Sequence, residues 1–301
     1  MVETGYPAHV TARVPIIDWH SGFDRHWNGG DPPATHAFNA LSFLFPDAER
    51  FFIEVVREVL PRVQLVRRND LESAVKVFIA QESAHSQQHA QYNAVLEQQG
   101  YENVVATFVT ALQRQSRERS SPLTRLAIVC AYEHFTAILG NFLLGRPQVL
   151  SSAPSAMALV WGWHSAEETE HKAVCFDLYQ AAGGGWLRRV VAFLAATLYF
   201  NLMFSRLYVS MLKRDGCFHR KNLITTMAQS CRFFFGFSGV GWHLIRYGFH
   251  YLSPTFHPWR QDNRGKLRDW LDANRHNLRV VCIIRTKSGS SGRAASARRS
   301  K

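Results

Sequence analysis

Residues 81–89 read QESAHSQQH and residues 163–171 read WHSAEETEH, and the predicted fold follows from these two stretches. In each stretch a glutamate precedes a histidine by three residues: Glu82 and His85 in the first, Glu168 and His171 in the second. An α-helix turns by about 100° per residue, so side chains three or four residues apart lie on one face. We therefore predict that both stretches are helical and that each directs its glutamate and histidine to the same side.

Two further predicted helices offer one glutamate each in apolar surroundings. Glu49 is followed by Phe51 and Phe52, and Glu133 lies between apolar residues of a long helical segment. Carboxylates in such surroundings rarely stay buried unless they are paired or bind metal. Helical-bundle proteins with carboxylate-bound metal pairs take one glutamate from each of two helices and a Glu-x-x-His pair from each of the other two. The chain holds this set in order: Glu49, Glu82 with His85, Glu133, and Glu168 with His171.

The sequence thus predicts a site for two metal ions. His164 lies four residues before Glu168 and shares its predicted face, so it joins the set. The four carboxylates balance the charge of two divalent ions, and mixed carboxylate and imidazole ligands suit iron; manganese and zinc are the alternatives. The predicted ligands are Glu49, Glu82, His85, Glu133, His164, Glu168 and His171.

Three neighbouring side chains have roles that the spacing leaves open. His89 lies four residues after His85, where it could be an extra ligand, a proton relay or a core histidine. Glu167 could hold a ligand histidine in one tautomer from outside the ligand shell. Glu170 lies two residues from Glu168, so we expect it to point away from the site into solvent.

Apolar periodicity and Gly, Pro or Asp breakers predict an all-α protein: a four-helix bundle with additional apolar helices toward the C-terminus. The predicted helices cover about residues 46–59, 71–98, 102–118, 122–144, 155–181, 186–213, 219–250 and 263–275. We divide the chain into an irregular segment 1–37, a metal-binding bundle 38–184, an apolar helical extension 185–284 packed on the bundle, and a basic disordered tail 285–301.

The net charge of +12 does not by itself indicate nucleic-acid binding, because six of the positive charges lie in residues 285–301. We expect a solubilising tail there. The five cysteines are odd in number and form no CxxC pair, which disfavours a disulfide framework and a cysteine zinc site. With no secretory signal pattern at the N-terminus, we predict a cytoplasmic protein.

Residues 190–205 form a run of sixteen residues without a charge. A membrane-spanning helix needs about 20 apolar residues, so we interpret this run as a buried core helix. The alternatives are contact with a membrane surface or with a partner, including a second copy in a homodimer.

The predicted ligand set resembles that of the ferritin-like di-iron carboxylate superfamily, and the His-x-x-x-Glu-x-x-His run 164–171 resembles that of di-iron N-oxygenases, which oxidise aryl-amines. The phrases FNALSFLFPDAERFF, FIAQESAHSQQHAQYN, WGWHSAEETEHKAVCFDLY and FHPWRQDN, within about residues 20–265, resemble a bacterial family labelled predicted metal-dependent hydrolases. The resemblance implies a ferritin-like bundle and a metal-dependent activity.

Three functions remain open on the sequence. The first is a di-iron enzyme that activates dioxygen to oxidise a small apolar or amine substrate. It would need a separate electron-transfer reductase, because the chain shows no dinucleotide-binding fingerprint. The second is a hydrolase that uses a metal-activated water. The third is a metal-binding protein without catalytic activity.

Overall fold

The computed structural model describes residues 9–237 and 239–285, and within them the protein is all-α apart from one two-stranded ribbon. The predicted basic tail, residues 285–301, lies outside the described residues except for Arg285. The helices are α1 (Pro32–Val59), α2 (Leu65–Gln98), α3 (Ala106–Arg119), α4 (Pro122–Gly145), α5 (Ser155–His171), α6 (Val174–Ala181), α7 (Trp186–Arg214), α8 (Arg220–Phe235), α9 (Val240–His250) and α10 (Arg264–Asn274).

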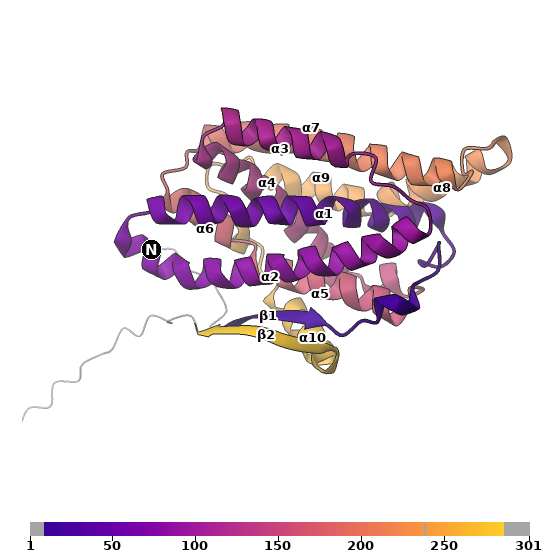
Figure 1. Ribbon diagram of the computed structural model, residues 1–301, viewed down its shortest axis with the longest axis horizontal. Coiled ribbons are helices and arrows are strands. Elements are labelled where there is room, and N and C mark those ends of the chain that lie inside the picture. The colour runs from indigo at the N-terminus through magenta and orange to yellow at the C-terminus, as the bar shows by residue number, and fades with distance from the viewer. Residues whose placement is uncertain (1–8, 238, 286–301) are drawn as a thin grey trace, which may run out of the picture.

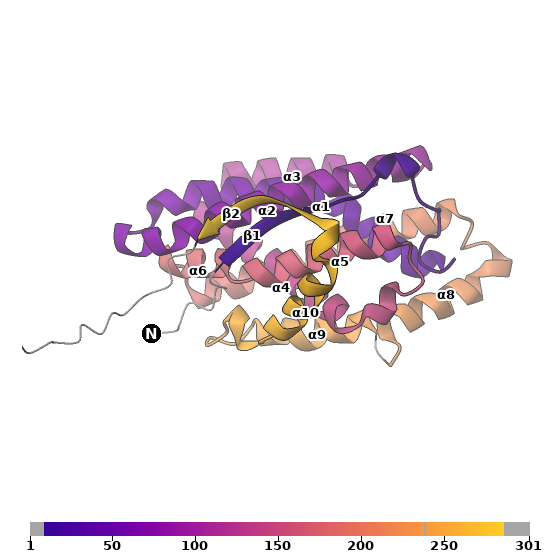
Figure 2. The ribbon, with the colours of Figure 1, turned by 90° about the horizontal axis from the view of Figure 1, so that it is seen from below.

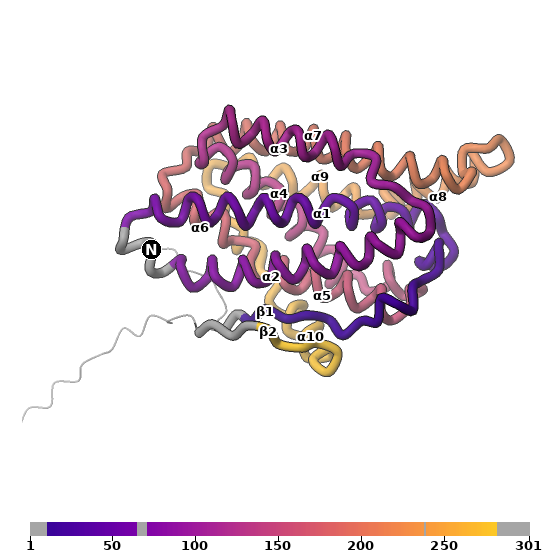
Figure 3. The backbone as a smooth tube through the Cα atoms, viewed as in Figure 1, coloured from indigo at the N-terminus to yellow at the C-terminus, as the bar shows by residue number. Residues whose placement is uncertain are grey.

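The long helices α1, α2, α4 and α5 form a bundle, and α6 continues the course of α5 after a short break (Figure 1). α1 and α2 lie side by side over most of the length of the molecule (Figure 3). The bundle contains two apolar cores. One includes Phe38, Tyr92 and Trp161, and the other includes Phe78 and Leu126. On all four helices, the residues between these two cores include the glutamates and histidines singled out by the sequence.

The C-terminal helices cover other sides of the bundle. α7 packs on α4 and α1, α9 packs on α4, and α8 bridges α1 and α9. α10 lies against α5 and α4 on another side (Figure 2). The division into segments 1–37, 38–184 and 185–284 remains a prediction, although α7 and α9 contact the bundle directly.

Three of the predicted helices, 46–59, 155–181 and 219–250, differ from the structure in their limits or are interrupted. α1 begins at Pro32 and not at Pro46, with the Asp31 side chain capping its first turn and Pro46 inside the helix. The residues before Pro46 are almost all buried, so packing outweighs the cost of about 3 kcal/mol that an interior proline imposes. The predicted helix 155–181 is interrupted at Lys172 and Ala173, and the predicted helix 219–250 is interrupted before Val240.

The expectation of an irregular N-terminal segment was wrong at residues 9–15. Strand β1 (His9–Pro15) pairs antiparallel with β2 (Leu278–Arg285), and the ribbon lies across α2 and α5 (Figures 1 and 2). The register shifts between Ala12 and Arg13, where Ala12 pairs with Cys282 and Arg13 with Val280. Such a bulge changes the direction of the strand locally, and here it lies in the strand that packs on α2 and α5.

By length and composition alone, α4 and α7 could each cross a membrane. The apolar window of α4 is 72 % buried inside the protein, as expected of a core helix, whereas that of α7 is only 28 % buried. The interpretation of residues 190–205 as a buried core helix was therefore wrong for most of its side chains. One face of α7 packs on the bundle and the rest is exposed.

Candidate metal centre

The structure brings all seven predicted ligand side chains together inside the bundle. None is more than 4 % exposed. Glu49 comes from α1, Glu133 from α4, and the two Glu-x-x-His pairs from α2 and α5. Close approach of the helices makes this convergence geometrically feasible. At Gly140 of α4, an added Cβ would lie 2.8 Å from the backbone oxygen of Ser165 on α5.

Six of the seven side chains form two neighbouring groups. Donor atoms of Glu49, His85 and His164 lie within 4.8 Å of one another, and so do donor atoms of Glu82, Glu133 and His171. A group of this size and composition matches the ligand set of a carboxylate-bound ion.

Glu82 also approaches His85 of the other group, and Glu168, the seventh side chain, approaches histidines of both groups. One oxygen of Glu82, Oε1, is 3.6 Å from His85 Nδ1 and 3.2 Å from His171 Nε2. The two oxygens of Glu168 face different sides, because Oε1 is 3.2 Å from His164 Nε2 and Oε2 is 3.4 Å from His171 Nε2. Each carboxylate therefore contacts histidines of both groups.

Nine of the donor atoms in this cluster have no hydrogen-bond partner. They include both oxygens of Glu49, Glu82 and Glu133, together with His85 Nδ1, His164 Nε2 and His171 Nε2. Buried polar atoms are nearly always satisfied, since an unsatisfied one costs about 1–3 kcal/mol. Their concentration at one point fits a pair of metal ions.

Each of the three histidines is fixed through its other ring nitrogen. His171 Nδ1 lies 3.0 Å from Gln81 Oε1 and His85 Nε2 lies 3.2 Å from Glu167 Oε2. Both oxygens can only accept, so each histidine donates there. When the ring is neutral, its inner nitrogen carries the lone pair that a metal ion would need. Glu167 therefore contacts the side of the His85 ring that faces away from the centre of the cluster. Metal-binding histidines are commonly oriented in this way.

The third histidine, His164, is held by His89. His164 Nδ1 lies 2.9 Å from His89 Nε2, and His89 Nδ1 lies 2.9 Å from Ser42 Oγ. Ser42 in turn donates to Asn93 Oδ1 at 2.7 Å. Both nitrogens of His89 are engaged, which favours the relay role over an additional ligand.

The expectation that Glu170 is solvated was wrong. Its side chain is 3 % exposed and accepts hydrogen bonds from Arg13 Nη1 at 2.9 Å and from Gln81 Nε2 at 2.8 Å. Burial raises the pKa of Glu170 to about 7 although Arg13 opposes the shift. The backbone N–H of Arg13, next to the β-bulge, donates to Glu167 at 2.7 Å. Strand β1 therefore supports two partners of the cluster, a role that the sequence did not reveal.

Electrostatics inside the cluster also favour positive ions. Burial, and then the charge of neighbouring carboxylates, raises the pKa of Glu49 and of Glu133 well above the ordinary value. Burial, and then the charge of His85, lowers the pKa of His164 to about 4, so this ring stays neutral and available as a ligand. Metal ions would relieve the repulsion between the carboxylates.

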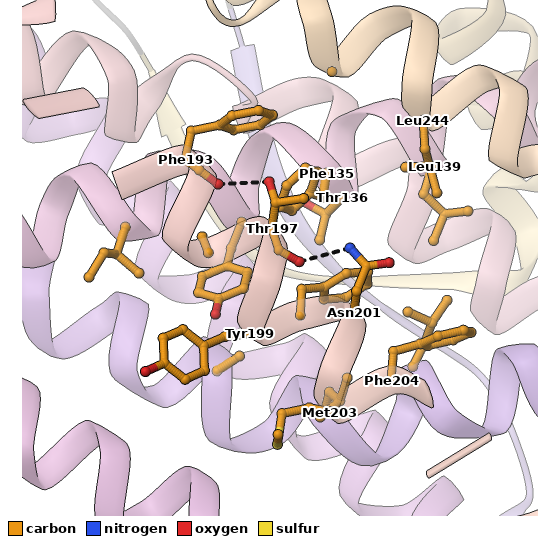
Figure 4. A pocket seen from close by; sticks show the side chains of 18 of the residues that line it. Phe135, Thr136, Leu139, Phe193, Thr197, Tyr199, Asn201, Met203, Phe204 and Leu244 are labelled. Carbon is orange, nitrogen blue, oxygen red and sulfur yellow. Dashed lines mark hydrogen bonds between the residues drawn. The ribbon is translucent and has the colours of Figure 1, made fainter. Parts of the chain in front are cut away.

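A large apolar cavity of about 1190 Å³ reaches the cluster. Glu49, Glu168 and Thr136 form part of its wall, and the Thr136 hydroxyl donates to Glu168 Oε2. Thirteen of the 21 phenylalanines line it. Figure 4 shows a set of lining side chains that includes Phe135, Thr136 and Leu139 of α4, Phe193, Thr197 and Phe204 of α7, and Leu244 of α9.

A second group of potential ligands lies away from this cluster. His26 Nε2 and His36 Nε2 lie 2.5 and 2.7 Å from Asp215 Oδ2. Tyr101 also donates to Asp215, at 2.8 Å, and Arg25 lies 3.6 Å from it. The carboxylate is thus saturated by donors and flanked by a cation, so we interpret this group as a hydrogen-bond network that ties α7 to α1.

The fold and the site define a helical-bundle protein with a buried carboxylate and histidine cluster that could hold two metal ions. Residues 11–262 match the family model described as predicted metal-dependent hydrolase, and the chain belongs to this family. Neither the curated proteins nor the solved structures gave a match. The family description indicates dependence on metal without naming the ion.

Proposed function

We propose that the seven clustered side chains bind two metal ions, with Glu82 and Glu168 as bridges. Glu49, His85 and His164 would complete one ion's ligands, and Glu133 and His171 the other's. The unpartnered donor atoms at the centre of the cluster are the observation that carries this proposal. The ligand order along four bundle helices also supports a ferritin-like relationship.

For the reaction, the geometry supports oxidation of an apolar substrate best. A cavity lined largely by phenylalanine adjoins Glu49 and Glu168, so a hydrocarbon group bound there would lie next to the metal pair. Two ferrous ions bound by these ligands would supply electrons and open positions for the activation of dioxygen. Further electrons would come from a separate reductase.

The chain's own residues have distinct roles in this proposal. The phenylalanine-rich wall binds the substrate and excludes water. The Thr136 hydroxyl lines the cavity and donates to Glu168. It can therefore hold a proton between the cavity and the Glu168 carboxylate. The chain of His164, His89 and Ser42 offers a second route for a proton away from the ligands.

Hydrolysis is the second candidate, and the family description supports it more directly than it supports oxidation. A metal-activated water would attack an ester or a related bond whose apolar part occupies the cavity. Among the described residues of the cavity wall, the charged side chains are Glu49, Arg119 and Glu168. Few polar groups are therefore available to bind a charged substrate such as a phosphate ester.

One experiment separates these candidates. The protein is loaded anaerobically with ferrous iron or with zinc. Dioxygen uptake is then measured with a chemical reductant present, and long-chain nitrophenyl esters are tested in parallel. Uptake by the iron form alone, without ester cleavage, supports oxidation. Ester cleavage by the zinc form, without dioxygen uptake by the iron form, replaces oxidation with hydrolysis. Stoichiometric metal without either activity leaves a non-catalytic metal-binding protein.

A further inference from the structure

The outer face of α7 is apolar, whereas the solvent-facing side of a surface helix in a soluble protein is usually polar. Leu187, Val191, Leu194, Leu198 and Leu202 follow one another at intervals of three or four residues, and each is at least half exposed. Side chains at this spacing form a continuous stripe along one side of a helix. Helix α7 lies on the side of the molecule opposite the β1–β2 ribbon (Figure 1).

Helices α8 and α9 extend this exposed apolar surface. Ile224, Met227 and Phe235 of α8 and Trp242 and Phe249 of α9 are each more than half exposed. Large exposed apolar patches on a soluble protein mark sites of interaction with a partner or a membrane.

The same three helices are strongly basic. Residues 186–250 contain nine lysines and arginines and one acid, Asp215, which is engaged by histidines and Tyr101. The exposed cations are Arg188, Arg206, Lys213, Arg214, Arg220, Lys221, Arg232 and Arg246, of which Arg232 pairs with Asp31 at 3.2 Å. An apolar helix face bordered by lysine and arginine is the pattern of helices that lie in the interface of an anionic bilayer.

The cavity reaches this surface. Leu194, Phe235, Ile245 and Phe249 line the cavity, yet between 46 and 65 % of each is exposed. The same side chains therefore belong both to the apolar surface and to the wall of the cavity that leads to Glu168.

We propose that the apolar surface of α7, α8 and α9 docks on an anionic lipid bilayer, so that the cavity receives its occupant from the hydrocarbon layer. The occupant is a molecule with a long apolar chain, and this second part rests on the function proposed above. The cavity volume of about 1190 Å³ exceeds the range of about 300–1000 Å³ that is usual for small-molecule sites.

Charge favours a bilayer over a second copy of the chain as the partner. A two-fold interface would bring the same surface of both copies together. Its exposed cations would then face one another, with no exposed acid between residues 186 and 250 to pair with them. Anionic headgroups satisfy these cations directly.

The test is flotation of the full chain with vesicles of phosphatidylcholine, with and without phosphatidylglycerol. The test variant is Leu198→Glu with Leu202→Glu, because these side chains are 60 and 50 % exposed and do not line the cavity. The matched control is Ile16→Glu, which follows β1 and is 66 % exposed. All three proteins retain the basic residues 285–301, so any contribution of these residues to vesicle binding is the same in each.

We expect the wild type and Ile16→Glu to float with the anionic vesicles and to bind less well to phosphatidylcholine alone. The double variant should lose about tenfold or more in vesicle partitioning, with unchanged metal content and melting temperature. Equal flotation of the double variant and the wild type, or no flotation of the wild type, overturns the proposal. A wild-type dimer that the double variant dissociates, without flotation, assigns the surface to a second copy. Flotation of a wild type that binds no metal leaves the docking intact and refutes the proposed function.

Discussion

Replacement of Gln81 by leucine tests how the hydrogen bonds around the cluster hold its ligands. Gln81 Oε1 accepts from His171 Nδ1 at 3.0 Å, and Gln81 Nε2 donates to Glu170 at 2.8 Å. Leucine keeps most of the volume but removes both functions. His171 then loses the acceptor that fixes its tautomer, and Glu170 loses one of its donors.

The magnitude follows from the position of His171. Loss of such an orienting partner typically lowers metal affinity by about 10- to 100-fold, or about 1.4–2.8 kcal/mol. His171 lies with Glu133 on one side of the cluster, whereas His85 and His164 lie on the other. We therefore expect one ion to bind more weakly and the other to keep its affinity.

The assay is an anaerobic titration with ferrous iron against a competing chelator. Gln91→Leu is the matched control, because Gln91 is exposed on the same helix and should bind both ions as the wild type does. Two equally tight ions in Gln81→Leu would refute the role given to His171. An equal loss of affinity for both ions would mean that the ligands do not form two separate groups around His85 and His171.

Three further predictions concern other parts of the molecule. Glu168→Ala should lose both ions, because its two oxygens face both sides of the cluster; metal analysis that still finds a full pair would contradict this bridging role. Leu139→Trp should fill the cavity beside α4, retain the metals and weaken binding of a long-chain fluorescent fatty acid; unchanged binding would place the ligand elsewhere. Asp215→Asn should cost about 1–3 kcal/mol in the free energy of unfolding, measured with urea. Burial alone would raise the pKa of Asp215, but hydrogen bonds from histidines and Tyr101 hold it well below the ordinary value. The stabilisation is therefore complete above about pH 4 and is lost at lower pH, and a wild-type minus variant difference that persists in acid would refute it.

The sequence predicted the all-α class because its helices have clear limits, such as Ser121 with Pro122 at the start of α4 and Gly100 after α2. The prediction that seven residues lie on common helix faces depended only on helical periodicity, and the structure places them in one cluster. Their identity as ligands stays a prediction.

Other features could not be predicted because they depend on contacts between distant segments. Arg13 reaches Glu167 and Glu170 only because β1 pairs with β2, a strand at the far end of the chain. Gln81 and Thr136 are neutral side chains with no motif of their own. Their importance follows from hydrogen bonds to residues in or beside the cluster. The cavity likewise arises from the packing of α1, α3, α4, α7, α8 and α9, which no local pattern encodes.

The most direct test of the central claim is metal analysis of protein purified without oxygen and reconstituted with ferrous iron, followed by optical spectra as dioxygen is added. The account predicts about two ions per chain, bound by the clustered carboxylates and histidines, and a transient charge-transfer band after addition of dioxygen. Two ions without any response to dioxygen would keep the metal centre and shift the reaction to hydrolysis. No stoichiometric metal after reconstitution would contradict the account.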